Sequence, residues 1–125
     1  MNVLILALDG VPTEMPGADV LVVAPALNSR LRHWVSDEDA ARRRAEDRVA
    51  AFIEHLERWG IHAQGRVGDA DPLLAIADAL SMFPADEIVI AAGNSSRLVE
   101  RLAAQARERF HLPTSHSAEP IPRAA

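Results

Sequence analysis

Three short, uninterrupted apolar runs constrain the fold of this chain more than any other feature. The runs are Val3–Leu8 (VLILAL), Asp19–Ala24 (DVLVVA) and Glu87–Ala92 (EIVIAA). A strand with one buried face alternates apolar and polar residues, whereas a strand buried on both faces is continuously apolar. Strands of the second kind occur in parallel sheets whose strands alternate with helices. The runs therefore predict an α/β fold with a mostly parallel sheet.

The segments between the runs have the spacing of amphipathic helices. Ser36 is suited to be the N-cap of a helix that continues to about Trp59, and Gly60 is suited to end it. Asp71 as N-cap and Pro72 as first helical residue begin a second, shorter helix. A third helix follows the last apolar run. The residues expected to face the core are Ala41, Ala45, Val49, Phe52, Ile53, Leu56 and Trp59 in the first helix, Leu73, Leu74, Ile76, Ala77, Leu80 and Phe83 in the second, and Leu98, Val99, Leu102, Ala106 and Phe110 in the third.

Two weaker segments complete the predicted sheet. Ile61–Val67 alternates weakly and is typical of an edge strand, and a short last strand is expected after Phe110. The first two runs are separated only by residues 10–18, which contain Pro and Gly and no helical period. A parallel crossover normally needs a dozen or more residues. We therefore expect its helix to be missing or reduced, unless the first two strands are not parallel. Residues 1–125 are expected to form one domain, with 117–125 as a flexible tail.

Composition excludes several classes of function. The net charge is −5, which does not favour nucleic-acid binding, since phosphate contacts need a concentrated basic face. There is no Cys, so disulfides and thiol chemistry are excluded, and a cytoplasmic location is compatible. The N-terminal apolar run is too short to span a bilayer and lacks the flanks of a signal peptide. Neither a membrane nor a nucleic-acid partner is expected.

The third apolar run leads into a candidate ligand site. It continues into Gly93-Asn94-Ser95-Ser96, which precedes a helix, and backbone N–H groups at such a turn hold anions. Asp9-Gly10 ends the first run, so both segments are expected at the carboxyl edge of the sheet, where α/β proteins bind ligands. The alternatives are a tight turn with a serine N-cap and a carboxylate that only accepts loop N–H bonds. The candidate site residues are Asp9, Gly10, Ala26, Asn28, Gly93, Asn94, Ser95 and Ser96.

Other polar clusters allow more than one interpretation. Leu27–Trp34 (LNSRLRHW) could stack on a base or hold a phosphate, or it could be a wrapping loop that packs on the core. Asp69 and Asp71 could be a hydrolytic acid pair, although capping of the next helix explains Asp71 without chemistry. The five His are scattered, so no metal site is expected. The sequence contains no nucleophile-elbow, P-loop or dinucleotide-binding motif.

Four stretches resemble the universal stress protein family, in its divergent actinobacterial branch. They are residues 18–52, residues 68–80 (GDADPLLAIADAL), residues 83–92 (FPADEIVIAA) and residues 107–116 (RERFHLPTSH). The resemblance implies a three-layer sandwich around a five-stranded sheet of order 3-2-1-4-5. It also implies a homodimer, a role in stress response or signalling without defined enzymatic turnover, and binding of ATP or AMP. Asp9 matches a family Asp that contacts adenine or ribose.

The chain departs from this family in two places. The first crossover helix is reduced or missing, so one apolar face of the sheet should be poorly covered, and we predict a homodimer that buries it. The long glycine-rich loop of ATP-binding members, roughly G-x-x-G-x(9)-G-[ST], is here shortened to a few residues after Gly93. A smaller ligand such as AMP is therefore favoured over ATP. The alternatives are a degenerate site in a dimerising protein-interaction module and, more distantly, a weak ATPase.

Overall fold

The protein is a five-stranded, entirely parallel sheet with helices on both faces. The computed structural model describes residues 1–10, 17–27, 38–93 and 97–117. The sheet order is β3-β2-β1-β4-β5, which confirms the predicted α/β fold and its strand order. The strands are β1 (Asn2–Ala7), β2 (Asp19–Pro25), β3 (Ala63–Gly68), β4 (Glu87–Ala91) and β5 (Thr114–Ser117), and the helices are α1 (Glu38–Arg58), α2 (Pro72–Leu80) and α3 (Arg97–Phe110).

The central position of β1 explains its continuous apolar run. Leu4 pairs with Leu21 on one side and with Ile88 on the other, so β1 has a parallel neighbour along both edges. Successive side chains of β1 then point to opposite faces. Val3 and Ile5 belong to the core under α1, whereas Leu4 belongs to the core under α2 and α3. Both faces of the strand are buried, as the sequence pattern predicts.

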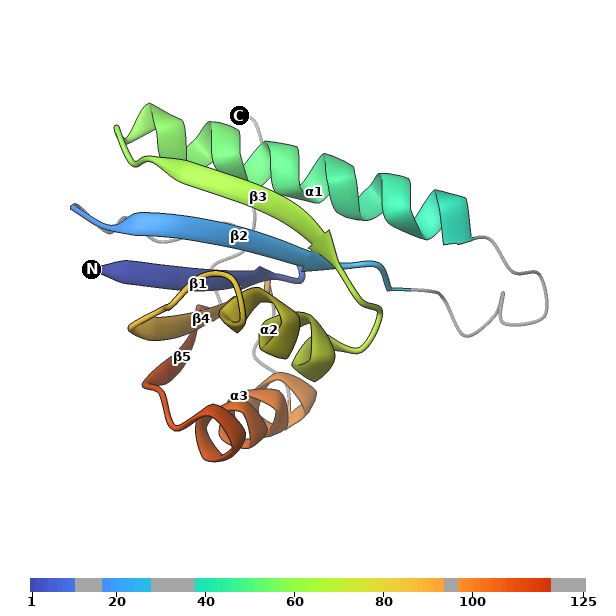
Figure 1. The fold of residues 1–125 in the computed structure, drawn as a ribbon. Helices are drawn as coiled ribbons and strands as arrows, with labels where there is room; N and C mark the ends of the chain where they lie inside the picture. The colour runs from blue at the N-terminus through green and yellow to red at the C-terminus, as the bar shows by residue number, and fades with distance from the viewer. Residues whose placement is uncertain (11–16, 28–37, 94–96, 118–125) are drawn as a thin grey trace.

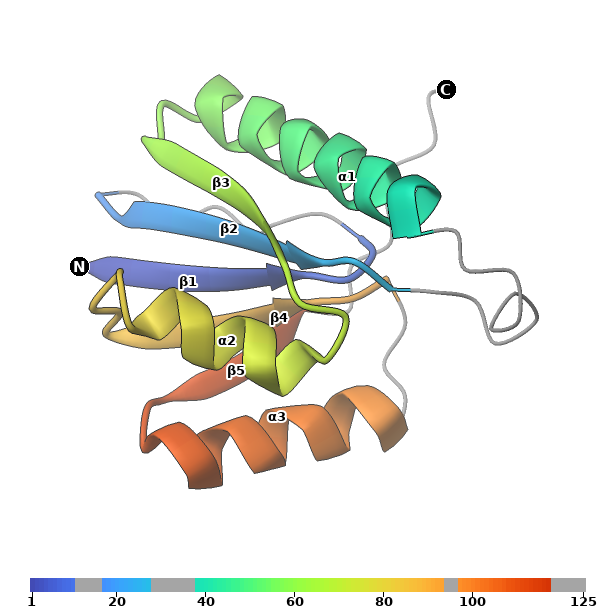
Figure 2. The same cartoon turned by 45° about the vertical axis from the view of Figure 1, so that its right-hand side comes forward.

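The helices form two unequal layers. Figure 1 and Figure 2 show α1 along one face of the sheet, beside β3 and β2, and both α2 and α3 on the opposite face. This arrangement follows from right-handed crossovers. The crossover from β2 to β3 and the crossover from β3 to β4 run in opposite directions along the sheet, so their helices lie on opposite faces. From β1 to β3 the chain adds strands toward one edge of the sheet, and from β4 to β5 it adds them toward the other edge. The order of strands therefore reverses between β1 and β4.

The predicted helix ends are confirmed where they are described. Asp71 caps α2, because its Oδ1 accepts a hydrogen bond from the N–H of Leu73 at 3.0 Å. Gly60 follows α1 with φ of 72°, and Ile61 N–H donates to the carbonyl of Leu56 at 3.0 Å, which is a Schellman end. The expected N-cap Ser36 lies outside the described residues.

Three side chains predicted to face the core are exposed instead. Leu98 is 75% exposed, Leu74 is also exposed, and Trp59 is 38% exposed. Both leucines lie in the first turn of their helix, next to the carboxyl ends of the strands, where the sheet that would cover them stops. Trp59 follows the last residue of α1 and packs edge-on against His55, with ring centroids 5.3 Å apart.

The connection between β1 and β2 contains no helix in its described residues, 8–10, 17 and 18. The two strands are nevertheless parallel, so the expected loss or reduction of the first crossover helix is the correct alternative. The prediction of a poorly covered sheet face is wrong: Val89 and Ala91, which share the face of α1, are 5% and 0% exposed within the single chain. The homodimer stays a prediction.

Helices long and apolar enough to cross a membrane are absent from the part of the chain that the structure describes.

Candidate functional site

The carboxyl ends of β1 and β4 lie side by side at the point where the order of strands reverses. Ala7 and Ala91 pair as the last residues of the two strands. Beyond them, the N–H groups of Leu8 and Asp9 both donate to the carbonyl of Ala91, at 3.0 and 3.2 Å. In open α/β sheets this point of reversal is where the ligand crevice forms. Three candidate residues, Asp9, Gly10 and Gly93, are brought together here, as the sequence predicts.

A hydrogen bond between Asp9 and Gly93 links the segments that follow β1 and β4. Asp9 Oδ1 accepts from the N–H of Gly93, and a Cβ atom at position 93 would lie 2.5 Å from that oxygen, so only glycine fits without a shift. The second carboxylate oxygen has no partner among the described residues. The interpretation of Asp9 as an acceptor of a loop N–H is therefore correct, and no described residue occupies its second oxygen.

Arg48 is a functional candidate that the sequence analysis missed. It lies on α1 between the buried residues Ala45 and Phe52, at the spacing of the inward-facing stripe. Its Nη1 atom is buried and has no hydrogen-bond partner among the residues that the structure describes. Burial lowers the pKa of Arg48 below its usual value, the negative charge of Asp9 opposes this shift, and the charge of Arg44 adds to it. An arginine nonetheless stays protonated at neutral pH.

The sequence does contain a signal for Arg48. Positions 41, 45, 52 and 56 are buried along α1, and the spacing of three and four residues makes position 48 part of the same stripe. A charged residue on the apolar side of a helix needs a partner once its polar atoms are buried. Arg48 is coupled electrostatically to Asp9 yet keeps a donor group unpaired. That combination suits a ligand that brings an anionic group to Arg48 and a donor group to Asp9.

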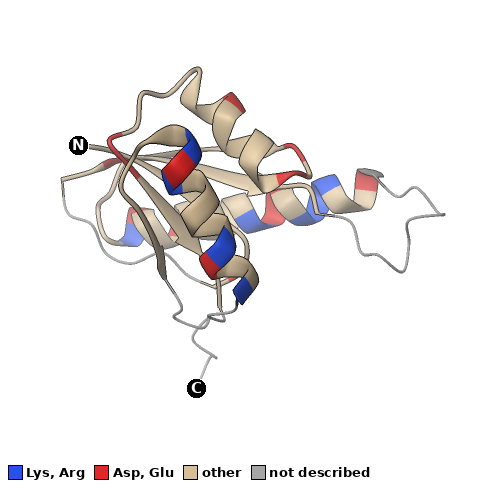
Figure 3. Cartoon of the chain, turned by 90° about the horizontal axis from the view of Figure 1, so that it is seen from below, with Lys and Arg blue, Asp and Glu red and all other residues tan. Residues whose placement is uncertain are grey.

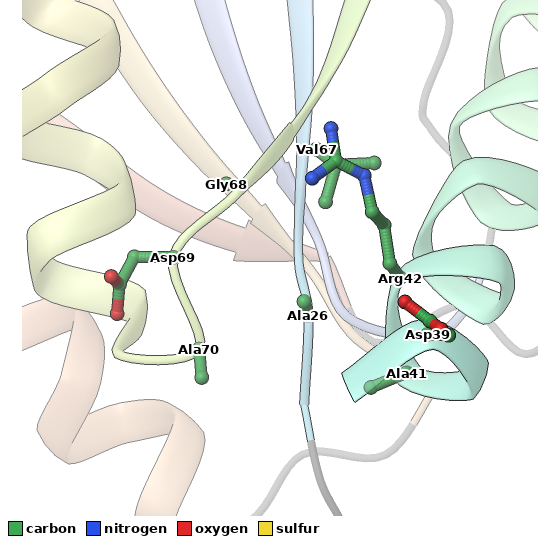
Figure 4. A pocket seen from close by; sticks show the side chains of 8 residues that line it. All are labelled: Ala26, Asp39, Ala41, Arg42, Val67, Gly68, Asp69 and Ala70. Atoms are coloured by element: carbon green, nitrogen blue, oxygen red, sulfur yellow. The ribbon is translucent and has the colours of Figure 1, made fainter. Parts of the chain in front are cut away.

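The predicted site residue Ala26 lines a cleft at the carboxyl ends of β2 and β3. This cleft has a volume of about 440 Å³ and is located between the carboxyl ends of β2 and β3 and the first turns of α1 (Figure 4). The Arg42 side chain extends from α1 toward Val67 on β3, whereas Asp69 lies on the opposite side of the cleft, toward α2 (Figure 4). Arg42 Nε is 3.4 Å from Glu46 Oε1, so part of its charge is already paired. Neither Asp9 nor Gly93 is among the described residues that line this cleft.

The two aspartates before α2 stabilise its start. Asp69 Oδ1 accepts from Asp71 N–H at 2.9 Å, and Asp71 in turn caps the helix. Of the two interpretations of this pair, helix capping is confirmed. In the described ranges, no group of three His, Asp or Glu residues could hold a metal ion. Figure 3 shows basic and acidic residues interleaved along the helices, without a continuous basic face among the described residues.

Four candidate residues cannot be placed. Asn28, Asn94, Ser95 and Ser96 lie outside the described residues, as do residues 28–34 of the Leu27–Trp34 cluster. Gly93 is the described residue of this turn, and its N–H group donates a hydrogen bond to Asp9.

Comparison with known proteins adds no assignment: no protein-family model matches the chain, and no curated protein matches it. The resemblance to universal stress proteins therefore stays a prediction.

Proposed function

We propose that the protein binds a small anionic ligand at the ends of β1 and β4, and that this ligand is an adenine nucleotide with a single phosphate, such as AMP. Arg48 carries the proposal. A buried guanidinium nitrogen without a partner costs free energy, which a bound phosphate would offset. The role is that of a non-enzymatic sensor in stress response or signalling, as the resemblance to universal stress proteins implies.

The geometry supports a ligand with one phosphate better than a triphosphate. The Gly93 N–H, which could otherwise contact a phosphate, is bonded to Asp9. The carboxylate would also repel additional phosphates placed close to it. Its second oxygen is suited to accept a hydrogen bond from a ribose hydroxyl or an adenine amino group. Only residues 94–96 separate Gly93 from α3, too few for a loop that wraps a triphosphate.

Calorimetric titration with AMP, ATP and cyclic AMP tests the proposal. We expect AMP to bind more tightly than ATP and Arg48→Met to weaken AMP binding at least about tenfold, since a hydrogen bond to a charged group contributes about 1.5–3 kcal/mol. Arg43→Met, on the exposed side of the same helix, is the matched control and should bind AMP like the unaltered protein. The absence of binding at millimolar nucleotide, or equal losses in the two variants, would refute the proposal.

A second candidate function, a dimerising interaction module, is supported by the outer edge of β3. This strand ends the sheet, and no described strand pairs with its other side. Met82 lies beside it and is 62% exposed, with its sulfur 3.3 Å from Arg66 Nη1. An unpaired strand edge next to exposed apolar surface is a template for strand pairing with another chain.

A further inference from the structure

We propose that a groove between α2 and α3 binds an aliphatic carboxylic acid of medium chain length. The aliphatic chain would lie against leucine side chains, and the carboxylate would contact Arg101. This site is distinct from the one formed by Asp9, Gly93 and Arg48, and it goes beyond the proposed nucleotide binding.

The groove is an apolar hollow at the carboxyl edge of the sheet. It has a volume of about 310 Å³, and residues of α2 and α3 line it. These two helices lie on the same face of the sheet (Figure 2). The side chain of Leu98 is 75% exposed, the highest fraction among the large apolar residues that the structure describes. Covering a solvent-exposed leucine with an apolar ligand is favourable, because it removes apolar surface from water. The apolar wall consists of Leu8, Leu27, Pro72, Leu98, Val99 and Leu102.

Arg101 gives the groove its charge preference. It lines the groove together with Gln105, and its side chain forms no described ion pair. On a helix, the residues three and four positions away are the side-chain neighbours. For Arg101 these neighbours are Arg97, Leu98, Ala104 and Gln105, none of which is acidic. The guanidinium is therefore available to an anionic ligand at the rim of an apolar surface.

The size of the groove favours a small ligand over a second protein chain. A stable interface buries about 800 Å² on each partner and involves about 20–30 residues a side. The groove is lined by eight residues, and its volume of about 310 Å³ lies at the lower end of the range of small-molecule sites. None of its described lining residues is aromatic, so these residues offer no surface for stacking a base or another flat ring. Leucine walls suit a flexible aliphatic chain.

Calorimetric titration of the full chain with hexanoate, octanoate and decanoate, each below its micelle concentration, tests this proposal. We expect affinity to rise about two- to fourfold for each added methylene, where fourfold corresponds to full burial. Octanamide, which has the same chain length without the charge, should bind more weakly than octanoate. Arg101→Gln should remove that difference while octanamide binding stays unchanged.

The apolar wall is tested by Leu98→Ser, which should weaken decanoate binding about three- to tenfold. The high exposure of Leu98 means that this change should not affect folding. Leu74→Ser is the matched control, because Leu74 is also an exposed leucine in the first turn of its helix but does not line the groove. Affinities that do not depend on chain length, equal binding of octanamide and octanoate, or equal effects of the two serine variants would each overturn the proposal. So would a dimer that Leu98→Ser dissociates, since a second copy would then occupy the groove.

Discussion

At the scale of single residues, Arg48 is the side chain whose position is hardest to explain by stability alone. Its buried Nη1 atom has no described partner, and burial lowers its pKa. A residue under these conditions destabilises the fold unless a ligand binds it. Functional sites often keep such costs, because the same unpaired group is what the ligand recognises.

We therefore expect Arg48→Met to stabilise the protein in the absence of ligand. Methionine keeps the apolar part of the side chain and removes the unpaired donor. The free energy of unfolding should rise by about 1 kcal/mol, whereas Arg43→Met should change it by no more than about 0.5 kcal/mol. Urea unfolding followed by circular dichroism measures both. A loss of stability in Arg48→Met would show that the guanidinium is paired in solution.

The pH dependence of this gain follows from the direction of the pKa shift. The folded pKa of Arg48 is lower than the unfolded one, so the folded state disfavours the protonated form. At any pH below both values the group is protonated in both states, and the full cost is present. The cost is lost only as the pH rises through the lowered pKa, which for an arginine is far from neutral. The stability difference between Arg48→Met and the unaltered protein should thus be constant between about pH 6 and pH 9.

Sequence reasoning found two of the three residues of the site formed by Asp9, Gly93 and Arg48. Asp9 and Gly93 follow apolar runs directly, and their meeting at the sheet edge follows from parallel pairing of the two strands. Arg48 is far from both in sequence and is one of several charged residues on α1. Its role depends on where α1 lies over the sheet, which helical spacing alone does not determine.

At the scale of elements, the position of α1 depends on a close approach to β3. A Cβ atom at Gly65 would collide with Val49 Cγ1 and lie 2.7 Å from Ile53 Cδ1, both on α1. The helix therefore lies closer to the strand than a side chain at this position permits. This contact fixes α1 relative to the sheet and, with it, the position of Arg48, whose charge interacts with that of Asp9.

We expect Gly65→Ala to destabilise the protein by about 2 kcal/mol, the usual scale for overpacking. Val49→Ala removes the closer of the two colliding atoms and leaves Ile53 in place, so the double variant should lose less stability than the sum of the two single variants. Gln64→Ala, at an exposed position of the same strand, is the control and should have a small effect. Unfolding in urea provides all four values. Additive losses would mean that α1 moves away from the strand instead of overpacking against it.

The helices and strands were largely predictable from the sequence. The residues at which the buried side of a helix stops being covered by the sheet were not. The apolar runs and the Asp71 cap correspond to local interactions that a sequence records directly. Leu98 has the helical phase of a core residue but lies beyond the end of the sheet, where phase no longer predicts burial. The same exposed first turn of α3 forms a wall of the apolar groove.

At the scale of the whole molecule, the sheet face next to the short connection between β1 and β2 is not the surface through which a homodimer would form. The described residues of this connection contain no helix, yet Val89 and Ala91, on the sheet face of α1, are buried within one chain. A dimer must therefore use another surface. The carbonyl of His62, just before β3, accepts a hydrogen bond from Val20 N–H. The carbonyl of Gly68, the last residue of β3, accepts one from Ala26 N–H, just after β2. Backbone groups alternate in direction along a strand. The N–H and carbonyl groups of Ala63, Gly65 and Val67 consequently point away from the sheet.

Sedimentation velocity at micromolar concentration tests a homodimer formed through this edge. We expect the unaltered protein to sediment as a dimer and Met82→Lys to sediment as a monomer. The added charge would lie beside Arg66, and lysines on edge strands oppose pairing with a second chain. Leu74→Lys is the control, since it adds the same charge at an exposed position that does not line the β3 edge. A monomeric unaltered protein would contradict the dimer itself. A dimer that persists in Met82→Lys would instead place the interface on a different surface, leaving the unpaired edge of β3 without this role.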